Sequence, residues 1–265
     1  MSPGTWSTAK ELLLELAAQY GAAGKRLVRV LKRTLGRSEL VWDTWERVRN
    51  AQRLLGYVRE ARRVPAGAVV FIGSSSVVRF PLERLFSGGP AVGRGLGAES
   101  VADILRRLRW TMPAARPSGV VVWAGANDLR ALAADPLVIV ERVARLLDAI
   151  HAHFPRVPIA ILGVPPWCEQ TESDLDRLRR LNAGLSSLAF ARGHGFVDVD
   201  RPPIAREDGS LAPEMADTDG KHLGAAGYEV LARWMLEQGG EAVAALSIAG
   251  QAGDGAPAPA GPDVP

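Results

Sequence analysis

Residues 69–80 read VVFIGSSSVVRF, an apolar run that stops at one glycine and three consecutive serines. A continuous apolar run is typical of a strand that is covered on both faces, as in a parallel sheet. Gly73 permits a tight turn after this strand, and serine is a favoured residue at the start of a helix. Two interpretations of the three hydroxyls compete here: a polar turn with a helix cap, or a serine nucleophile.

The composition is that of an ordinary globular protein. Its 265 residues, 47% of them hydrophobic, suffice for one large domain or for a domain with appendages. The net charge of only +3 argues against a dedicated nucleic-acid binder, so no nucleic-acid partner is expected. The single cysteine, Cys168, excludes an internal disulfide framework and a cysteine-rich zinc site.

The distribution of apolar residues predicts a cytoplasmic protein. No apolar run reaches the ~18–20 residues that span a bilayer. Residues 1–21 carry acidic residues around a very short apolar patch and make a poor signal peptide. Residues 25–37, KRLVRVLKRTLGR, would form a basic amphipathic helix. Such a helix either packs on the domain or gives residues 8–37 a peripheral contact with an anionic membrane or a partner protein.

Three zones follow one another along the chain. Residues 1–64 predict an N-terminal helical extension, residues 65–248 a catalytic domain, and the Gly-, Ala- and Pro-rich residues 249–265 a disordered tail. In the middle zone β-branched runs alternate with amphipathic stretches. The expected strands are 69–72, 119–123, 159–162 and 196–199, with a weaker one near 91–92, and the expected helices are 99–111, 136–153, 171–192 and 223–238. This alternation predicts an α/β fold with a doubly wound parallel sheet of about five strands between two helix layers.

The functional site of such a sheet lies at the carboxyl ends of its strands, and polar residues follow several of them. Ser75 comes after the first strand, where free backbone N–H groups at a helix start could serve as an oxyanion site. Residues 91–100, AVGRGLGAES, allow close approach of the backbone to a ligand. Asn127 follows the strand 119–123, and its amide N–H could bind a developing negative charge. Taken singly, each feature has a structural explanation as a cap or a turn.

A carboxylate and an imidazole come together late in the chain. Asp219 and His222 lie three residues apart on a loop before an amphipathic helix. A carboxylate at this spacing can accept the imidazole Nδ1–H and stabilise the imidazolium. Asp217 is a rival for that role, and a simple helix entry is the structural alternative. A nucleophile, oxyanion donors, a base and an acid would all meet at one edge of one sheet.

This set resembles the SGNH/GDSL hydrolase family, in the branch whose nucleophile block reads G-S-S-S. The resemblance covers residues 65–238 and implies the flavodoxin-like three-layer fold and the serine esterase or acylhydrolase activity of that family. It implies a triad of Ser75 as nucleophile, His222 as base and Asp219 as the carboxylate that orients His222. With Ser75 in that role, the hydroxyl of the following residue, Ser76, is expected to cap the helix.

The resemblance also implies an oxyanion hole. Its donors would be the backbone N–H groups of Ser75 and of Gly97 or Ala98, together with the Asn127 side chain. The sequence GRGLGAES departs from the family's block N-R-G-x-G-G-S at two points. Gly93 replaces the usual asparagine, and Ala98 stands where the second glycine would be, which leaves Gly97 as the alternative donor.

The implied reaction is hydrolysis of a small-molecule acyl ester through an acyl-enzyme, with small acyl or acetyl esters favoured and no metal or organic cofactor required. Two alternatives remain open. The same residues would serve an O-acyltransferase, in which an alcohol replaces water. A non-enzymatic module that binds a membrane or a partner through the basic N-terminal helix belongs to a different class of function.

Overall fold

The computed structural model describes residues 39–249, with side chains from residue 46 onward. The predicted basic helix at 25–37 and nearly all of the predicted tail lie outside these residues. The chain divides into two compact units, residues 1–53 and 54–265. Helix α3 (Glu39–Glu60) runs through that division. The predicted domain boundary at residue 64 stays a prediction.

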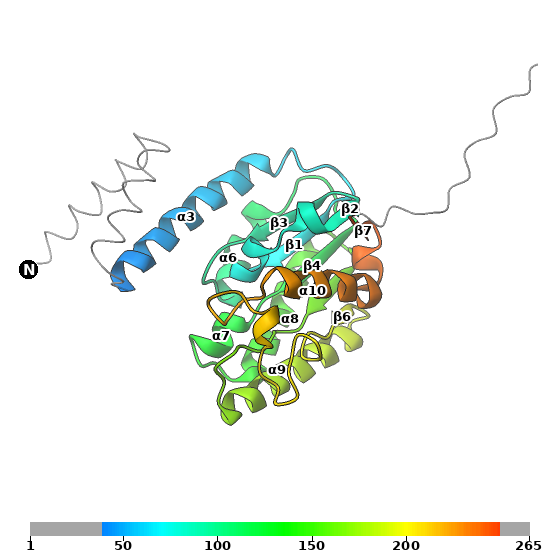
Figure 1. Ribbon diagram of the computed structural model, residues 1–265. Helices are drawn as coiled ribbons and strands as arrows, with labels where there is room; N and C mark the ends of the chain where they lie inside the picture. The colour runs from blue at the N-terminus through cyan, green and yellow to red at the C-terminus, as the bar shows by residue number, and fades with distance from the viewer. Residues whose placement is uncertain (1–38, 250–265) are drawn as a thin grey trace, which may run out of the picture. The chain divides into compact units, whose positions relative to one another are not determined.

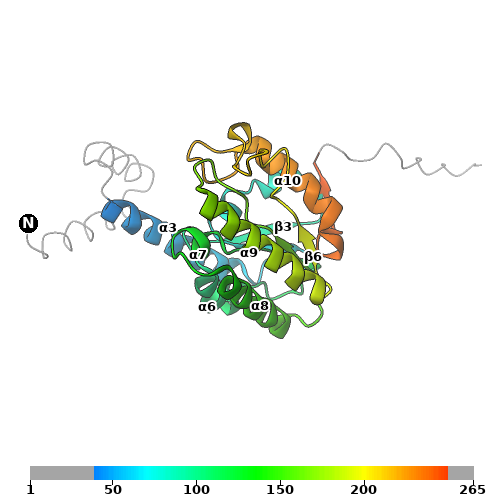
Figure 2. The same cartoon turned by 90° about the horizontal axis from the view of Figure 1, so that it is seen from below.

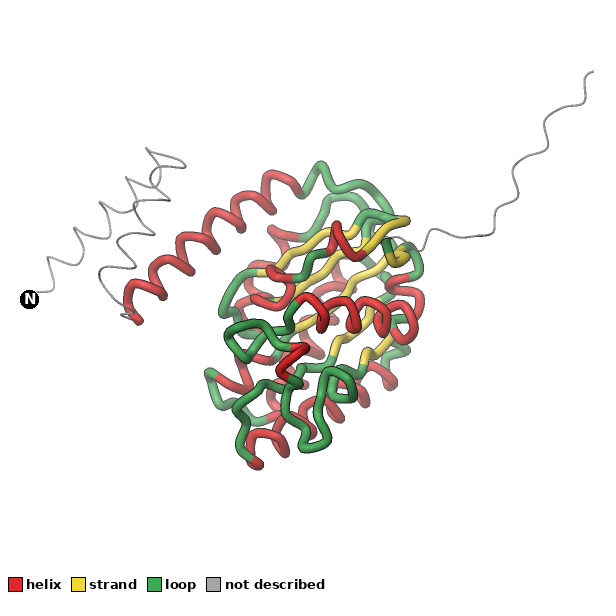
Figure 3. The backbone as a smooth tube through the Cα atoms, viewed as in Figure 1, coloured by secondary structure: helices red, strands yellow, loops and turns green. Residues whose placement is uncertain are grey.

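A single parallel sheet forms the centre of the second unit (Figures 1 and 3). Its strand order is β3-β1-β4-β5-β6, and every neighbouring pair is parallel. The strands are β1 (Val69–Gly73), β3 (Ala91–Gly95), β4 (Gly119–Trp123), β5 (Ile159–Leu162) and β6 (Gly195–Val197). The chain runs outward from β1 in both directions, which places the switch in strand order beside β1 and confirms the predicted doubly wound α/β fold.

Helices cover both faces of this sheet (Figure 2). The long ones are α6 (Val101–Thr111), α8 (Pro136–His153), α9 (Glu172–Ala191) and α10 (Ala225–Gln238). The short ones are α4 (Ser75–Arg79), α5 (Leu82–Leu85), α7 (Ala126–Arg130), η1 (Pro213–Met215) and η2 (Gly240–Val243). Sequence signals explain several helix starts: Ser100 with Asp103 forms a capping box on α6, and Thr171 with Asp174 forms one on α9.

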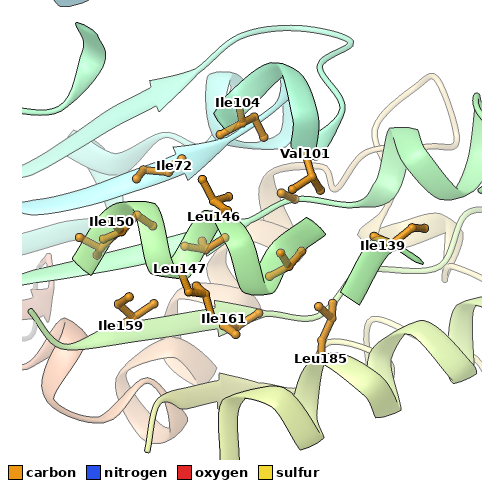
Figure 4. Packing of buried hydrophobic residues seen from close by; sticks show 14 of the residues in the cluster. Ile72, Val101, Ile104, Ile139, Leu146, Leu147, Ile150, Ile159, Ile161 and Leu185 are labelled. Carbon is orange, nitrogen blue, oxygen red and sulfur yellow. The ribbon is translucent and has the colours of Figure 1, made fainter. Parts of the chain in front are cut away.

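Strand alternation divides the core into two clusters. Val70 and Ile72 of β1 face one cluster, which α6, α8 and α9 complete. Figure 4 shows this packing, with Ile104 of α6 and Leu146 of α8 near the strand residues. Val69 and Phe71, the alternate residues, face the second cluster beneath α4, α5 and α10. Because β1 is buried on both faces, its carboxyl end is fixed between two packed layers, and the loop that follows it starts from a rigid support.

A second, smaller sheet was not expected from the sequence. Strand β2 (Phe86–Gly88) pairs antiparallel with β7 (Leu246–Ile248). The pairing joins the segment after α5 to the last described residues of the chain. No helix among residues 39–249 is long and apolar enough to cross a membrane.

Candidate active site

A close approach between the ends of β1 and β4 sets the position of the turn before Ser75. A Cβ at Gly73 would lie 2.3 Å from the carbonyl oxygen of Trp123, so only glycine fits at this point. Helix α4 then begins at Ser75, with Ser74 as its N-cap residue and no side-chain cap bond. The predicted cap at Ser76 is therefore wrong, because Ser76 lies inside the helix, where its carbonyl accepts a hydrogen bond from Tyr228 Oη at 2.9 Å.

The three predicted triad residues lie in one hydrogen-bonded row. Ser75 Oγ is 2.7 Å from His222 Nε2, and His222 Nδ1 is 2.7 Å from Asp219 Oδ2. With the imidazole proton on Nδ1, that nitrogen donates to Asp219 and leaves Nε2 to accept from the Ser75 hydroxyl. The row joins the start of α4 to the loop before α10, across 147 residues of sequence.

The loop that carries His222 folds around the carboxylate of Asp219. Asp219 Oδ1 accepts hydrogen bonds from the backbone N–H groups of Lys221 at 2.9 Å and His222 at 3.0 Å. The backbone N–H of Asp217 donates to the His222 carbonyl at 2.8 Å and closes the turn. The carboxylate of Asp217 pairs with Arg79 instead of the imidazole. The geometry thus selects Asp219, not Asp217, as the partner of His222.

These contacts determine the ionisation of the pair. Partial burial alone would raise the pKa of Asp219, but hydrogen bonds from Lys221 and His222 outweigh it and hold that pKa well below its ordinary range. Burial lowers the pKa of His222, and Asp219 offsets part of that effect. At neutral pH the site therefore holds a charged carboxylate beside a neutral imidazole, which is the state that a general base requires.

The predicted oxyanion residues lie on the loops after β3 and β4. Gly97 is buried and Ala98 is exposed, in the loop between β3 and α6. Ala98 adopts φ +57°, the left-handed conformation that a glycine would take without strain. Asn127, in α7, donates from Nδ2 to the carbonyl of Glu99 at 2.9 Å. The loop that holds Gly97 and Ala98 is thus tied directly to Asn127.

Asp128, the residue after Asn127, fixes the same loop, a role that the sequence analysis did not predict. Its fully buried carboxylate accepts a hydrogen bond from the backbone N–H of Val101 at 2.9 Å, at the start of α6. Its other oxygen pairs with Arg142 at 2.8 Å. Asn127 and Asp128 therefore hold residues 99 and 101 on either side of the α6 cap.

A buried arginine, Arg107, joins the two strand ends that flank the site. It pairs with Glu99 at 2.7 Å and donates to the carbonyl oxygens of Gly73 at 3.1 Å and Arg94 at 2.9 Å. Burial raises the pKa of Glu99, and the guanidinium of Arg107 opposes that rise. Sequence reasoning missed this residue, although its spacing of three from Ile104 on the buried stripe of α6 is a signal that could have revealed it.

Cys168 lies beside the loop of His222, but its environment does not suit a nucleophile. Its backbone N–H donates to the Gly220 carbonyl at 2.9 Å, and its thiol points to the Leu211 carbonyl. Burial raises the pKa of the thiol, which keeps it protonated at neutral pH. Among residues 39–249, no group of three or more histidine, cysteine or acidic side chains is placed to hold a metal ion.

Comparison with solved structures shows the same fold in bacterial proteins. A Streptococcus pneumonia protein, provisionally described as a platelet activating factor, aligns with a TM-score of 0.67 and 21% identity over 75% of this chain and 96% of that one. A GDSL-like lipase from Bacteroides thetaiotaomicron aligns with a TM-score of 0.57 and 22% identity over 69% and 97%. The aryl esterase of M. smegmatis aligns with a TM-score of 0.50 and 17% identity over 65% and 97%.

Comparison of the sequence with known proteins gives the family. A search of curated protein sequences found no significant match. The model of the GDSL-like lipase/acylhydrolase family matches residues 74–230, more than half of the chain. That match runs from the turn before Ser75 through the loop of Asp219 and His222 and into α10. The chain therefore belongs to the GDSL-like lipase/acylhydrolase family, a family of ester hydrolases.

Proposed function

We propose that this protein is a serine esterase that cleaves small carboxylic esters through an acyl-enzyme on Ser75. The continuous row from Ser75 Oγ through His222 to Asp219, with 2.7 Å at each junction, supports the proposal most directly. His222 Nε2 would take the proton of Ser75 as Oγ attacks the ester carbonyl, and Asp219 would stabilise the imidazolium. His222 would then protonate the leaving alcohol and activate the water that releases the acid.

The tetrahedral oxyanion would be bound by donors from three segments that follow β1, β3 and β4. Ser75 is the first residue of α4, and a backbone N–H at that position has no acceptor inside its own helix. The loop after β3 would add the N–H of Gly97 or Ala98. The Asn127 amide has two N–H bonds, and its bond to the Glu99 carbonyl uses one of them. The other would serve the oxyanion, and the reaction would need no metal or organic cofactor.

The charges around the triad favour a short acyl group. Arg79 and Asp217 form an ion pair beside the triad, where both side chains are more than a third exposed. At the end of α7, Arg130 donates to the Lys221 carbonyl at 3.4 Å, and its guanidinium lies 5.4 Å from the ring centre of Trp167. A long apolar chain would have to desolvate these groups, whereas an acetyl or another small acyl group would not.

A chain-length series of p-nitrophenyl esters tests the proposal. The Ser75→Ala variant is expected to lose about 10⁴–10⁶-fold in kcat, as serine hydrolases do when the nucleophile is removed. Ser76→Ala is the matched control, because the next residue of α4 contributes its carbonyl, not its hydroxyl, to a described bond. Acetyl and butyryl esters should be the best substrates of the wild-type enzyme.

Labelling with a fluorophosphonate probe supplies a second readout. Wild type and Ser76→Ala should gain one covalent adduct, and Ser75→Ala none. Equal turnover and equal labelling in all three proteins would rule out Ser75 as the nucleophile.

A further inference from the structure

Arg79 stands one helical turn from Ser75. The two residues are the first and the last of α4, and residues four apart lie on the same face of a helix. The Arg79 side chain therefore extends along the side of α4 on which Ser75 meets His222.

The guanidinium of Arg79 joins two carboxylates of the loop that carries His222. Its Nη1 lies 2.6 Å from Asp217 Oδ2, and its Nη2 lies 3.0 Å from Asp219 Oδ2. The second of these oxygens is also the one that lies 2.7 Å from His222 Nδ1. A permanent cation and the imidazole thus share one carboxylate oxygen. Two ion pairs link the helix of the nucleophile to the loop of the base.

Charged groups on three elements face His222. Asp219 lies on its own loop together with the more exposed Asp217, Arg79 extends from α4, and Arg130 extends from α7. Burial lowers the pKa of His222, the hydrogen bond to Asp219 raises it, and Arg79 and Arg130 lower it. Arg79 acts in two ways, because it repels a protonated imidazole and competes with it for Asp219 Oδ2.

We propose that Arg79 is a positioning residue, which fixes the loop of Asp217 and Asp219 against α4 and opposes the binding of a proton by His222. The inference rests on the proposed role of His222 as a base. Arg79 does not touch the reacting atoms, and it acts through Asp219 and the imidazole. Its effect is to extend the activity of the enzyme toward lower pH, since only the neutral imidazole can accept the proton of Ser75.

An NMR titration of the imidazole Cε1–H signals tests the charge coupling without any measurement of activity. The protein has four histidines, and the signal that disappears in His222→Gln identifies His222. The titration midpoint of His222 should rise in Arg79→Gln and return toward the wild-type value in Arg79→Lys. Arg84→Gln is the matched control, because it removes an exposed arginine of α5 that pairs with Glu229 of α10 at 3.4 Å. This control should leave the titration midpoint of His222 unchanged.

Asp217→Asn gives a change of the opposite sign. It removes a negative charge near His222, and Asp219 becomes the one remaining carboxylate of this loop that pairs with Arg79. The titration midpoint of His222 should therefore fall. A midpoint that stays at the wild-type value in folded Arg79→Gln would overturn the proposal. If Arg79→Gln does not fold, an unchanged midpoint in Asp217→Asn would overturn it.

The pH dependence of kcat/KM with p-nitrophenyl acetate connects this coupling to the reaction. The acid limb should move to higher pH in Arg79→Gln, and each unit of movement lowers kcat/KM tenfold at a pH on that limb. The alkaline plateau should change less than the acid side does. A uniform loss at every pH would indicate a structural role alone and contradict the proposal. A shifted NMR midpoint in a protein without esterase activity would contradict the proposed function but not the coupling.

Discussion

Two arginines hold the loops on either side of Ser75, and they do so in opposite environments. Arg107 and Glu99 pair at 2.7 Å with side chains only 5% and 13% exposed. Arg79 and Asp217 pair at 2.6 Å with side chains 39% and 38% exposed. The distances are nearly the same, but the first pair lies in a low dielectric medium and the second in contact with water.

The difference separates two tasks at one site. The buried pair is satisfied by further bonds from Arg107 to the Gly73 and Arg94 carbonyls, so it fixes the ends of β1 and β3 in one geometry. Removing one member would leave an uncompensated buried charge. The exposed pair adds little to stability because water and salt screen it. Its proposed effect is electrostatic: the charge of Arg79 beside Asp219 influences the protonation of His222 more than the conformation of the loop.

The largest effect on stability is expected from Arg107→Met. This change leaves the Glu99 carboxylate buried without its partner, and the free energy of unfolding should fall by about 3–5 kcal/mol. The matched control is Arg106→Met, one position earlier on α6, where an exposed ion pair with Asp103 is removed. The control should cost no more than about 1 kcal/mol. Urea denaturation of the three proteins measures both values, and equal losses would contradict the contrast.

Asn127→Ala is expected to have a large effect on catalysis and a small effect on stability. The variant loses the proposed oxyanion donor, and kcat should fall about 10²–10³-fold. It also loses one hydrogen bond to the Glu99 carbonyl, which should cost only about 0.5–1.5 kcal/mol of unfolding free energy. Steady-state kinetics and urea denaturation on the same preparation give the two numbers. A loss of kcat below tenfold would remove Asn127 from the proposed oxyanion hole.

Salt sharpens the comparison between the two arginines. Arg79→Gln should lower the free energy of unfolding by about 0.2–1 kcal/mol at low ionic strength. At 1 M NaCl the screening length is about 3 Å, and this difference should largely vanish. The loss caused by Arg107→Met should persist, because buried charges are screened much less. Denaturation of both variants at two salt concentrations checks this, and a salt-insensitive Arg79 effect would argue against screening by solvent.

The smallest effect is expected at Ala98. Its left-handed backbone costs an L-residue about 1–2 kcal/mol. Glycine relieves that strain but loses about 0.4–1 kcal/mol through the greater freedom of the unfolded chain. Ala98→Gly should therefore raise the free energy of unfolding by up to about 1.6 kcal/mol, which urea denaturation can measure. A destabilised variant would contradict this expectation. It would show that the methyl group of Ala98 contributes more to the free energy of unfolding than the backbone strain costs.

The sequence sufficed to predict the sheet because its strands carry a strong local signal. The buried runs at Val69–Gly73 and Gly119–Trp123 are continuous and β-branched, and these two strands agree with the predicted ranges within one residue. The agreement is looser at the sheet edges, where β6 ends two residues earlier and β3 runs three residues further than predicted. The pairing of β2 with β7 could not be predicted, because each strand has three residues and the two lie 160 residues apart in the chain at Ser87 and Ser247. No local pattern specifies a pairing of that range.

For the site, the reacting groups were easier to predict than the residues that support them. Ser75, Asn127 and His222 each follow a strand or precede a helix, where a polar side chain is conspicuous, and their catalytic roles stay predictions. Arg79 looks like an ordinary surface charge in the sequence, and only its spacing from Ile104 on the buried stripe of α6 distinguishes Arg107. Their partners come from loops that only the fold brings near, so their roles depend on tertiary contacts that one sequence cannot specify.

The separation of Ser75 and His222 along the chain has a consequence for the synthesis of the protein on the ribosome. The two residues lie 147 positions apart. At about 5–20 residues per second, synthesis takes roughly 7–30 s to advance from one to the other. For that time a nascent chain holds Ser75 without His222, the base that is proposed to activate it. Because β7 follows later still, the small antiparallel sheet can form only after the proposed triad has been synthesised. The proposed esterase activity would therefore begin only when the fold is nearly complete.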